Sequence, residues 1–508
     1  MGNRLRQGGY SRLIRVAALV NTDEQAGITM AAEGDTVREK TAEGSQQGAL
    51  AVFRSAPRYT YLVASVAALG GLLFGYDIGV ISGAEIPLTK AFHLSPGAEE
   101  LAVAAVLIGA VIGGLFAGKL ADRISRRWAL LVMAVIYGVG AVLTAISPGY
   151  WWFFAFRVLT GIAVGASSMI VPVFIAELAP RRVRGALVIL QQLAIACGIL
   201  VSYLFDYLYT VLGWGWRPMF ATAVVAAAAL AIGMILLDHS PRWLAMRGRW
   251  DEARVVTAKV DPGASDEEIE AIRDSIEAEQ SSSWRDLLKP GLRGALIAGV
   301  GLALFQQFIG PNTVLFYGPT IFSYVGATSS SDALVSTIYV GLTLFVFVFV
   351  AIALVDLIGR KALFYIGLTG MTAMLVAIGF IFRAGASQYG VLLLVALIIY
   401  IACYSTSISP LFWLMSAEVF PTRLRAVGAS WCSVANWSAN LLVTVTYLTM
   451  IADIGKSWTF WTYAIVGVLA LVFVRFLVPE TKARPLEDIE DYWTSGQRWP
   501  QHSGAGSQ

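Results

Sequence analysis

The segment ELAPRRVRG at residues 177–185 has a second copy later in the chain, EVFPTRLRA at residues 418–426. Another repeated pair lies upstream of these, DRISRR at residues 122–127 and DLIGRK at residues 356–361. The copies are 241 residues apart in the first pair and 234 in the second. This near-constant spacing predicts that a whole half of the protein has been duplicated. In a duplicated hydrophobic bundle, a binding site is expected where the two halves meet.

The repeated charged segments interrupt a strongly apolar chain. Hydrophobic residues make up 57% of it and charged residues 14%, which is unusual for a soluble protein. The apolar runs are continuous and close to the ~20 residues that a helix needs to cross a bilayer, which excludes a β-barrel. The sequence therefore predicts an all-α membrane protein with twelve transmembrane helices in two pseudo-symmetric six-helix halves. The predicted spans are residues 60–82, 101–121, 128–147, 151–176, 187–209, 217–237, 292–323, 333–355, 362–384, 389–416, 426–450 and 459–478.

Basic residues in the short loops predict the orientation of these helices. They concentrate in the four repeated segments, all on one side of the membrane, whereas the opposite loops contain chiefly Lys90 and Lys456. By the positive-inside rule, both termini are expected in the cytoplasm of a multi-pass plasma membrane protein. The opposite loop at about 83–100 is short and has no glycosylation sequon, which favours a bacterial inner membrane.

Polar segments divide the chain into five parts. Residues 1–56 are expected to form a disordered cytoplasmic tail, because they are polar and of mixed charge. Two six-helix halves follow at residues 57–237 and 292–478. A cytoplasmic insert at 238–291 separates the halves, and a cytoplasmic tail at 479–508 ends the chain.

The insert carries a helical pattern. Ser265 and Glu268 match a capping box, and Ile269, Ile272 and Ile276 then recur on one face of a helix. This pattern predicts short amphipathic helices that lie against the cytoplasmic surface. A catalytic domain is not expected in this segment.

The first span contains an ionisable residue within GGLLFGYDIGVISG, residues 70–83. Asp77 lies away from a stripe of glycines at every fourth position, a pattern that lets another helix approach closely. An acid at this depth is costly and is a functional residue by default. Asp77 is the only carboxylate expected deep in a span, and Arg157 of the fourth span is expected to pair with it. The alternatives are a purely structural ion pair and an Arg157 that extends to the outer surface near Trp152.

Neutral amides lie in three other spans. Gln191 and Gln192 belong to the fifth span, and Gln306 and Gln307 to the seventh. Pro311 has no backbone donor, so the seventh helix is predicted to break there and the carbonyl near Gln307 to lose its partner. The eleventh span adds further amides beside a tryptophan, and the tenth adds hydroxyl groups and another tryptophan. Such amides and rings suit an uncharged, polyhydroxylated ligand, and the alternative is that they only hydrogen-bond helices together.

These motifs together resemble the sugar porter family of the major facilitator superfamily, which includes bacterial xylose– and glucose–proton symporters and human facilitative glucose transporters. The resemblance covers about residues 57–490. It rests on residues 70–83, the two repeated pairs, SPRWL at 240–244, FQQFIGPNTVLFY at 305–317 and PETK at 479–482.

The resemblance implies a role for each group of residues. Proton-coupled members carry an aspartate and an arginine where Asp77 and Arg157 stand. The sugar site would correspond to Phe74, Gln192, Gln306, Gln307, Asn312, Tyr317, Trp413, Asn436, Trp437 and Asn440. A cytoplasmic gate that ties the halves together when the site faces outward would correspond to Arg126, Glu177, Arg184, Arg360, Glu418 and Arg425.

The chain departs from the family pattern at several positions. Ile199 stands where the xylose symporters have a second glutamine, and Leu344 lies at or beside an asparagine that is common in the family. Ala223 replaces an acidic residue near the Asp–Arg pair. Xylose specificity therefore does not follow from the resemblance, and the detailed proton relay of the xylose symporters is not implied either.

The leading hypothesis is proton-coupled symport of a neutral monosaccharide, a hexose, pentose or related polyol, by alternating access. Passive uniport and non-transporting sugar sensing are the alternatives. An enzyme is not expected, because the chain has three histidines, no phosphate loop and no Cys/His metal spacing. No cofactor, metal, nucleic acid or obligate protein partner is indicated. The sequence does not select among glucose, galactose, xylose, arabinose and myo-inositol.

Overall fold

The computed structural model describes most of the chain between residues 58 and 495. The described residues are 58–178, 184–260, 266–280, 284–289, 291–324, 329–385, 388–421, 424–482 and 486–495. The predicted tail at residues 1–56 and the capping residue Ser265 lie outside this part of the chain.

The elements of the described part are helices, and twelve spans are long and apolar enough to cross a bilayer. This confirms the predicted fold class. The spans are α2 (Arg58–Phe92), α3 (Pro96–Ile124), α4 (Arg126–Ala145), α5 (Tyr150–Leu178), α6 (Arg184–Val211), α7 with α8 (Trp216–Ala221 and Ala223–Leu236), α12 with α13 (Arg293–Phe308 and Pro311–Phe316), α15 (Ser330–Ile358), α16 (Arg360–Arg383), α17 with α18 (Gly390–Thr406 and Ile408–Glu418), α19 (Arg425–Asp453) and α20 (Lys456–Leu477).

Shorter helices lie between and after these spans. Four of them belong to the predicted insert, where helices were expected, and Ile269 of that segment is buried. The short helices are α9 (Pro241–Met246), α10 (Trp250–Val260), α11 (Asp266–Gln280), the 3-10 helix η1 (Trp284–Leu288), α14 (Gly318–Ser323) and α21 (Leu486–Thr494).

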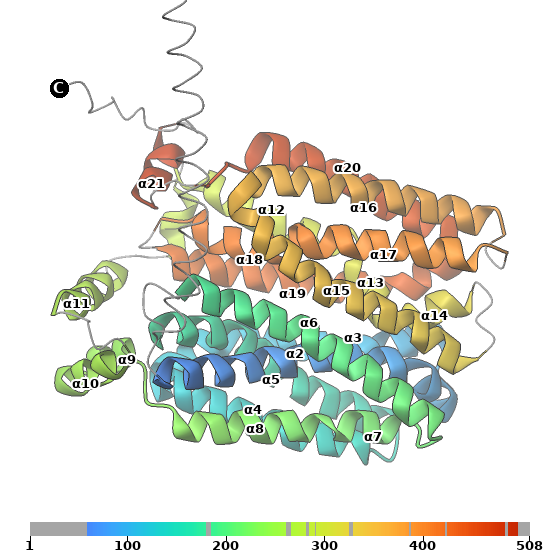
Figure 1. Cartoon of the computed structure of the whole chain (residues 1–508), viewed down its shortest axis with the longest axis horizontal. Coiled ribbons are helices and arrows are strands. Elements are labelled where there is room, and N and C mark those ends of the chain that lie inside the picture. The colour runs from blue at the N-terminus through green and yellow to red at the C-terminus, as the bar shows by residue number, and fades with distance from the viewer. Residues whose placement is uncertain are drawn as a thin grey trace, which may run out of the picture. The chain divides into compact units, whose positions relative to one another are not determined.

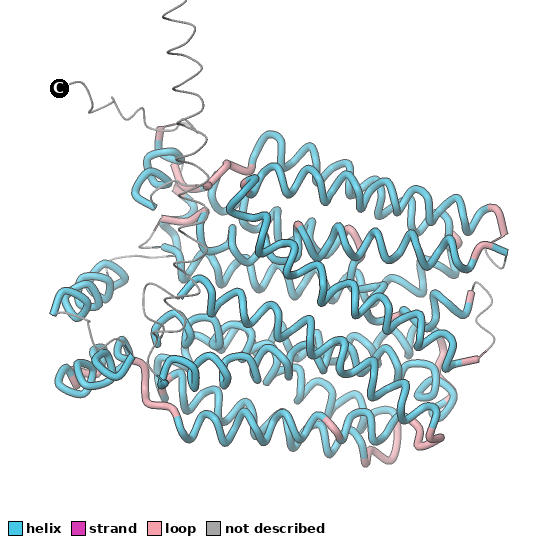
Figure 2. The backbone as a smooth tube through the Cα atoms, in the orientation of Figure 1, coloured by secondary structure: helices cyan, strands magenta, loops and turns pink. Residues whose placement is uncertain are grey.

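The helices form two groups. Figure 1 shows α2 to α8 side by side in one group and α12 to α20 in the other, with α9, α10, α11 and α21 at one end of the bundle. Figure 2 shows that short loops join successive spans. We call the end with α9–α11 the insert end and the opposite end, where α7 and α14 lie, the far end.

The outward faces of the helices are apolar. Val225, Ile232 and Leu236 of α8 are 67%, 60% and 61% exposed. A surface helix of a soluble protein carries polar residues on its exposed face, so these side chains indicate contact with lipid. The protein is a multi-pass membrane protein.

The backbone has the same conformation at equivalent positions of the two repeats. Ser125, between α3 and α4, has φ 85° and ψ 153°, and Gly359, between α15 and α16, has φ 89° and ψ 164°. Glycine adopts this conformation readily, whereas serine does so only under constraint. The Ser125 hydroxyl accepts from the backbone of Trp128 at 3.3 Å and contacts the His239 ring at 3.0 Å, which holds the loop in place.

The glycine stripe of α2 brings α6 close, as predicted. A Cβ atom at Gly75 would lie 1.9 Å from the carbonyl oxygen of Ile195, and one at Gly71 would lie 2.7 Å from that of Gln191. Only glycine fits at such a distance. The contact places the segment of α6 that carries Gln191 beside the turns of α2 that come just before Asp77.

The seventh span breaks where Pro311 predicted. Helix α12 ends at Phe308, Gly310 adopts a left-handed φ of 86°, and α13 begins at Pro311. The expectation of an unpaired carbonyl near Gln307 was wrong, because the backbone N–H of Gly310 donates to the Gln307 carbonyl at 2.9 Å. The left-handed glycine turns its own N–H back to that carbonyl, so the break costs no backbone hydrogen bond at this position.

Candidate functional site

Asp77 of α2 and Arg157 of α5 form a buried ion pair. Arg157 Nη1 donates to Asp77 Oδ1 at 2.7 Å and Nη2 donates to Oδ2 at 3.3 Å. The hydroxyl of Tyr137 on α4 also donates to Oδ1, at 3.1 Å. Arg157 is 1% exposed, so the alternative in which it extends to the surface is wrong. Two parallel charge-assisted bonds fix the carboxylate between three helices of one half.

A cavity of about 60 Å³ lies between the two groups of helices. A single water needs roughly 10–15 Å³, so the cavity has room for more than one water molecule. Its lining includes nine of the ten residues predicted for a sugar site: Phe74, Gln192, Gln306, Gln307, Asn312, Trp413, Asn436, Trp437 and Asn440. These residues come from five different spans, and the first and the last of them, Phe74 and Asn440, are more than three hundred positions apart in the sequence.

Tyr317 is the predicted residue that does not line this cavity. It is fully buried, its hydroxyl donates to the carbonyl of Thr444 at 3.2 Å, and its ring stacks on Tyr447 at 5.0 Å. The kink between α13 and α14 turns this side chain toward α19 and away from the cavity. It is linked to the cavity through Thr444, whose hydroxyl donates to Asn440 Oδ1 at 3.4 Å.

Four amides of the cavity, those of Gln306, Gln307, Asn312 and Asn436, form one hydrogen-bonded network. Gln306 donates to the carbonyls of Ile408 and Ser409 at 3.3 and 3.1 Å, which ties α12 to the start of α18. Gln307 donates to Asn436 Oδ1 at 3.1 Å, and Asn312 donates to Gln307 Oε1 at 2.7 Å. Because these four amides are held by their neighbours, their remaining donors and acceptors are presented to the cavity in fixed positions.

Aromatic rings close the cavity on one side. Phe74 of α2 and Trp437 of α19 lie 5.4 Å apart between ring centroids, one from each group of helices. The indole N–H of Trp437 is buried and has no hydrogen-bonding partner within the described residues. A buried unpaired donor is costly, so this N–H suits a ligand oxygen or an ordered water.

Sequence reasoning missed part of the lining. Tyr404 and Ser409 stood out only as polar residues of the tenth span, and Ile199 and Leu344 only as departures from the family pattern. Ile78, Ile195 and Leu315 were not expected to line a site, because their apolar side chains give no signal that separates them from ordinary core residues. Within the described part of the chain, the lining contains no charged side chain, which favours a neutral ligand.

At the insert end, the repeated charged segments form ion pairs within each group of helices. Arg126 binds Asp122 at 2.8 Å and Glu177 at 3.2 Å, so the pair joins α4 to α5. Arg242 of α9 also approaches Glu177, at 4.0 Å. Arg126 and Glu177 are both largely buried, which makes this contact more than a surface pair.

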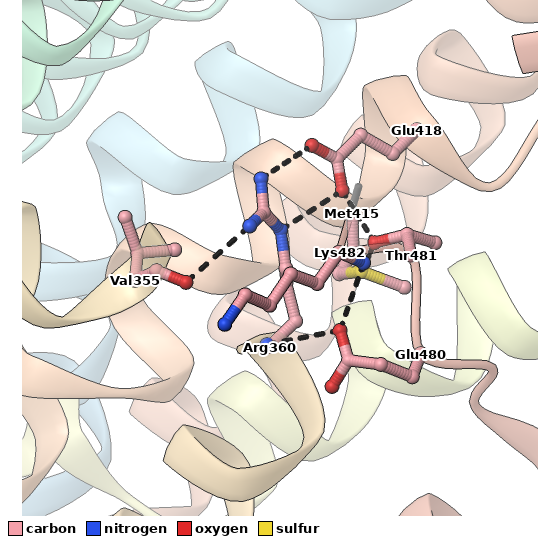
Figure 3. A network of polar contacts seen from close by, with 7 residues as sticks. All are labelled: Val355, Arg360, Met415, Glu418, Glu480, Thr481 and Lys482. Carbon is pink, nitrogen blue, oxygen red and sulfur yellow. Dashed lines mark hydrogen bonds and ion pairs between the residues drawn. The ribbon is translucent and has the colours of Figure 1, made fainter. Parts of the chain in front are cut away.

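The second copy repeats this arrangement in the other group, as Figure 3 shows. Arg360 Nη2 donates to Glu418 Oε1 at 3.0 Å, and Thr481 donates to Glu418 Oε2 at 2.6 Å. Glu480 accepts from the backbone N–H groups of Arg360 and Lys361 at 3.1 and 2.8 Å. The carboxylate of Glu480 thus caps the start of α16.

These pairs do not join the two groups of helices, which the resemblance had implied for an outward-facing site. The side chain of Arg184 lies outside the described part, and α19 begins at Arg425. In the described residues, polar contacts between the groups lie at the cavity and at the far end. Gln192 contacts Ser409 at 3.5 Å beside the cavity, and the far-end contacts involve two glutamates.

Comparison with known proteins identifies the family. The family model described as "Sugar (and other) transporter" matches residues 63–493. The chain belongs to this family. Its architecture is that of the sugar porters of the major facilitator superfamily.

Similar sugar transporters are known in bacteria. A D-xylose transporter of Levilactobacillus brevis is 41% identical over 428 residues, which cover 83% of this chain and 93% of that protein. A galactose-proton symporter of Escherichia coli is 35% identical over 451 residues, covering 88% and 97%. The solved structure described as the partially occluded inward open conformation of the xylose transporter XylE from E. coli has a TM-score of 0.75 at 33% identity, covering 84% of this chain and 99% of that one.

This sugar transporter carries more buried acids than its sequence suggested. Asp77 was expected to be the only deep carboxylate, but Glu85, Glu100 and Asp206 are 1%, 3% and 0% exposed. Glu85 and Glu100 lie at predicted span ends, where acids are usually solvated, and packing between the two groups buries them. Asp206 lies within the predicted fifth span, and its sequence position alone was a sufficient signal.

Proposed function

We propose that this protein is a proton-coupled symporter of a neutral monosaccharide that works by alternating access. The observation that carries the proposal is a buried Asp77–Arg157 pair in the same bundle as a cavity lined by neutral amides and rings. A hexose, a pentose or a related polyol fits this chemistry. The substrates are the sugar and the proton, and no cofactor is required.

The cavity residues have complementary roles. Gln192, Gln306, Gln307, Asn312, Asn436 and Asn440 donate to and accept from the hydroxyl groups of the sugar. Phe74, Trp413 and Trp437 cover its C–H surfaces. Tyr317 contributes indirectly, through its bond to Thr444, which in turn donates to Asn440. Ile199 and Leu344 form an apolar wall, which favours substrates with few polar groups on that side.

Asp77 is the proton-coupling group in this proposal. While it is ionised, Arg157 and Tyr137 hold it between α2, α4 and α5. Protonation forms an O–H bond on the carboxyl and removes the charge that Arg157 binds. The ion pair then weakens, and α2 and α5 are free to change their relative positions. One group that titrates once per cycle is sufficient for one proton per sugar.

The orientation follows from the charged segments. We place the insert end, both termini and the ion pairs of Glu177 and Glu418 in the cytoplasm of a plasma membrane protein, with six-helix halves at 57–237 and 292–478. The gate residues Arg126, Glu177, Arg184, Arg360, Glu418 and Arg425 then control access from the cytoplasm. Polar contacts close the far end, which agrees with an inward-facing conformation.

The Asp77→Asn variant tests the coupling. A proton that crosses 100 mV supplies roughly 2.3 kcal/mol, more than a tenfold accumulation of sugar. The amide cannot release a proton, so we expect the variant to lose uphill accumulation in proteoliposomes with an imposed pH gradient, while sugar binding and sugar–sugar exchange continue. A panel of radiolabelled glucose, galactose, xylose, arabinose and myo-inositol identifies the substrate.

A matched control is Asp453→Asn, which changes an exposed carboxylate at the end of α19 and should leave accumulation unchanged. Accumulation by Asp77→Asn against a sugar gradient would exclude Asp77 as the coupling group. Wild-type transport without any proton dependence would instead establish passive uniport.

A further inference from the structure

Asp206 of α6 is a buried carboxyl group that the proposed mechanism does not use. It is 0% exposed, its carboxyl oxygens have no side-chain hydrogen-bonding partner within the described residues, and the backbone N–H of Gly83 lies beside them. The side chain lies against the backbone of α2, because a Cβ atom at Gly83 would be 2.6 Å from Asp206 Oδ2. The hydroxyl of Ser82 on α2 is also fully buried and lies beside the phenol of Tyr203.

Within the described residues, cationic groups do not neutralise this carboxyl. Helix α6 packs against α2, α5, α7 and α15. Arg157 of α5 binds Asp77, and Arg217 of α7 donates to the carbonyls of Ala145 and Ser147. Neither of them reaches Asp206.

The other titratable groups on α6 and the helices packed against it do not bind Asp206 either. Tyr76, one of the phenols nearest to the carboxyl, donates to the Met219 carbonyl at 2.8 Å. Glu85 accepts from Thr320 at 2.9 Å. The remaining described groups are Tyr59, Tyr61, Lys90, Tyr150, Glu177, Cys197, Tyr203, Tyr207, Tyr209, Asp332 and Tyr339, and none forms a hydrogen bond or ion pair with Asp206.

A carboxylate cannot remain ionised in this environment without a large cost in free energy. Burial of an unpaired charge costs several kcal/mol or more, and such a group takes up a proton instead. With the proton bound, the carboxyl group is neutral and can donate to an acceptor within reach. The packing between α2 and α6 therefore suits the protonated form.

The burial of Asp206 is tied to closure of the far end. Tyr203 lies three residues before Asp206 on the same face of α6, and its hydroxyl donates to the carbonyl of Leu315 on α13 at 2.8 Å. This bond joins the two groups of helices. The ring of Tyr203 also packs on Gly341 of α15, because a Cβ atom at Gly341 would lie 2.7 Å from that ring. Separation of the groups at the far end breaks these contacts and opens a path for water toward Ser82 and Asp206.

We propose that Asp206 is a second proton-binding site, which takes up a proton from the far side when that end closes and returns it when that end opens. This inference rests on the proposed function, because it assumes alternating access. The proton forms an O–H bond on the Asp206 carboxyl, and water on the far side donates and recovers it. Asp77 carries the transported proton, whereas Asp206 makes closure of the far end depend on the pH outside.

The test removes Asp77 from the titration. Full-length Asp77→Asn is reconstituted in liposomes, and exchange of the radiolabelled sugar that wild type accepts from the panel is measured at equal sugar concentration on both sides. The pH of the bath is varied while the internal pH is buffered. We expect the exchange rate to retain a dependence on bath pH, at most about tenfold per pH unit, the limit for one titrating group.

The double variant Asp77→Asn/Asp206→Asn shows whether Asp206 causes the dependence of the exchange rate on bath pH. The amide has the shape of the protonated carboxyl and cannot titrate, so we expect the dependence on bath pH to disappear. Asp77→Asn/Asp453→Asn is the matched control and should keep it. Infrared spectra of otherwise wild-type protein should lose a protonated-carboxyl C=O band on Asp206→Asn, which checks the site even if exchange is slow.

The outcomes are distinct. Exchange by Asp77→Asn that does not depend on bath pH overturns the Asp206 site, and so does a dependence that persists in the double variant together with an unchanged infrared spectrum. Absence of proton coupling in wild type overturns the proposed symport but leaves the assay of Asp206 valid, since exchange needs no gradient.

Discussion

At the scale of single residues, the cavity contains polar groups that neighbouring residues already orient and one buried N–H group that has no hydrogen-bonding partner within the described residues. Gln306 is held by two backbone carbonyls of α18 and by Asn436, so its position does not depend on a ligand. Trp437, in contrast, keeps a buried N–H without a partner. A sugar hydroxyl that accepts from this N–H removes a desolvation cost already present in the empty protein, which favours binding.

We expect Gln306→Ala to weaken sugar binding about tenfold or more. Loss of one buried hydrogen-bonding partner costs roughly 1–3 kcal/mol, and Asn436 also loses its neighbour. Calorimetry on the purified protein measures the affinity. Gln191→Ala is the matched control, because Gln191 is buried on α6 but does not line the cavity. Equal sugar affinity in Gln306→Ala and wild type would show that the sugar binds elsewhere.

At the scale of helices, the seventh span shows what a sequence can and cannot predict. Pro311 and Gly310 located the break, because proline lacks a donor and glycine accepts a left-handed conformation. The direction in which Tyr317 points was not predictable, since it depends on a second kink before α14. The twelve spans were predictable from length and hydropathy. The apolar part of the cavity wall was not, because Ile195 and Leu315 resemble any other core residue.

Gly310→Ala should destabilise the protein more than the same change at a glycine whose added methyl meets no neighbour. Gly310 and Gly455 have φ values of 86° and 84°, so alanine is strained at both positions, by about 1–2 kcal/mol. At Gly310 the added methyl would also lie 2.7 Å from the ring of Tyr463, whereas Gly455 faces open space. Thermal unfolding in detergent should show a larger fall in Tm for Gly310→Ala than for Gly455→Ala. Equal shifts would mean that Tyr463 moves away at no cost.

At the scale of the whole molecule, the charged repeats form contacts within each group of helices, whereas the far-end glutamates form contacts between the groups. Each repeat pairs within its own group of helices, Arg126 with Glu177 and Arg360 with Glu418. The duplication and the partners of these pairs were predictable from spacing and charge. The far-end contacts were not, since they join α3 to α19 and α2 to α14 across 349 and 235 residues and no motif marks them.

Glu100 forms the strongest of these far-end contacts. Glu100 accepts from both the backbone N–H and the hydroxyl of Thr449, at 2.8 and 2.7 Å. Hydrogen bonds to a charged group contribute about 1.5–3 kcal/mol each, and 1.4 kcal/mol is a tenfold change in an equilibrium. Glu100→Ala should therefore shift the balance toward an open far end by about tenfold or more. Thr449→Val should have a smaller effect, because the backbone N–H remains.

Distances between spin labels on the far ends of α3 and α19 report the balance directly. Thr446→Val is the matched control, since that hydroxyl bonds only to carbonyls of its own helix. The distance distribution should broaden toward longer values in the order Thr446→Val, Thr449→Val, Glu100→Ala. If all three variants keep the wild-type distribution, apolar packing and not Glu100 closes the far end.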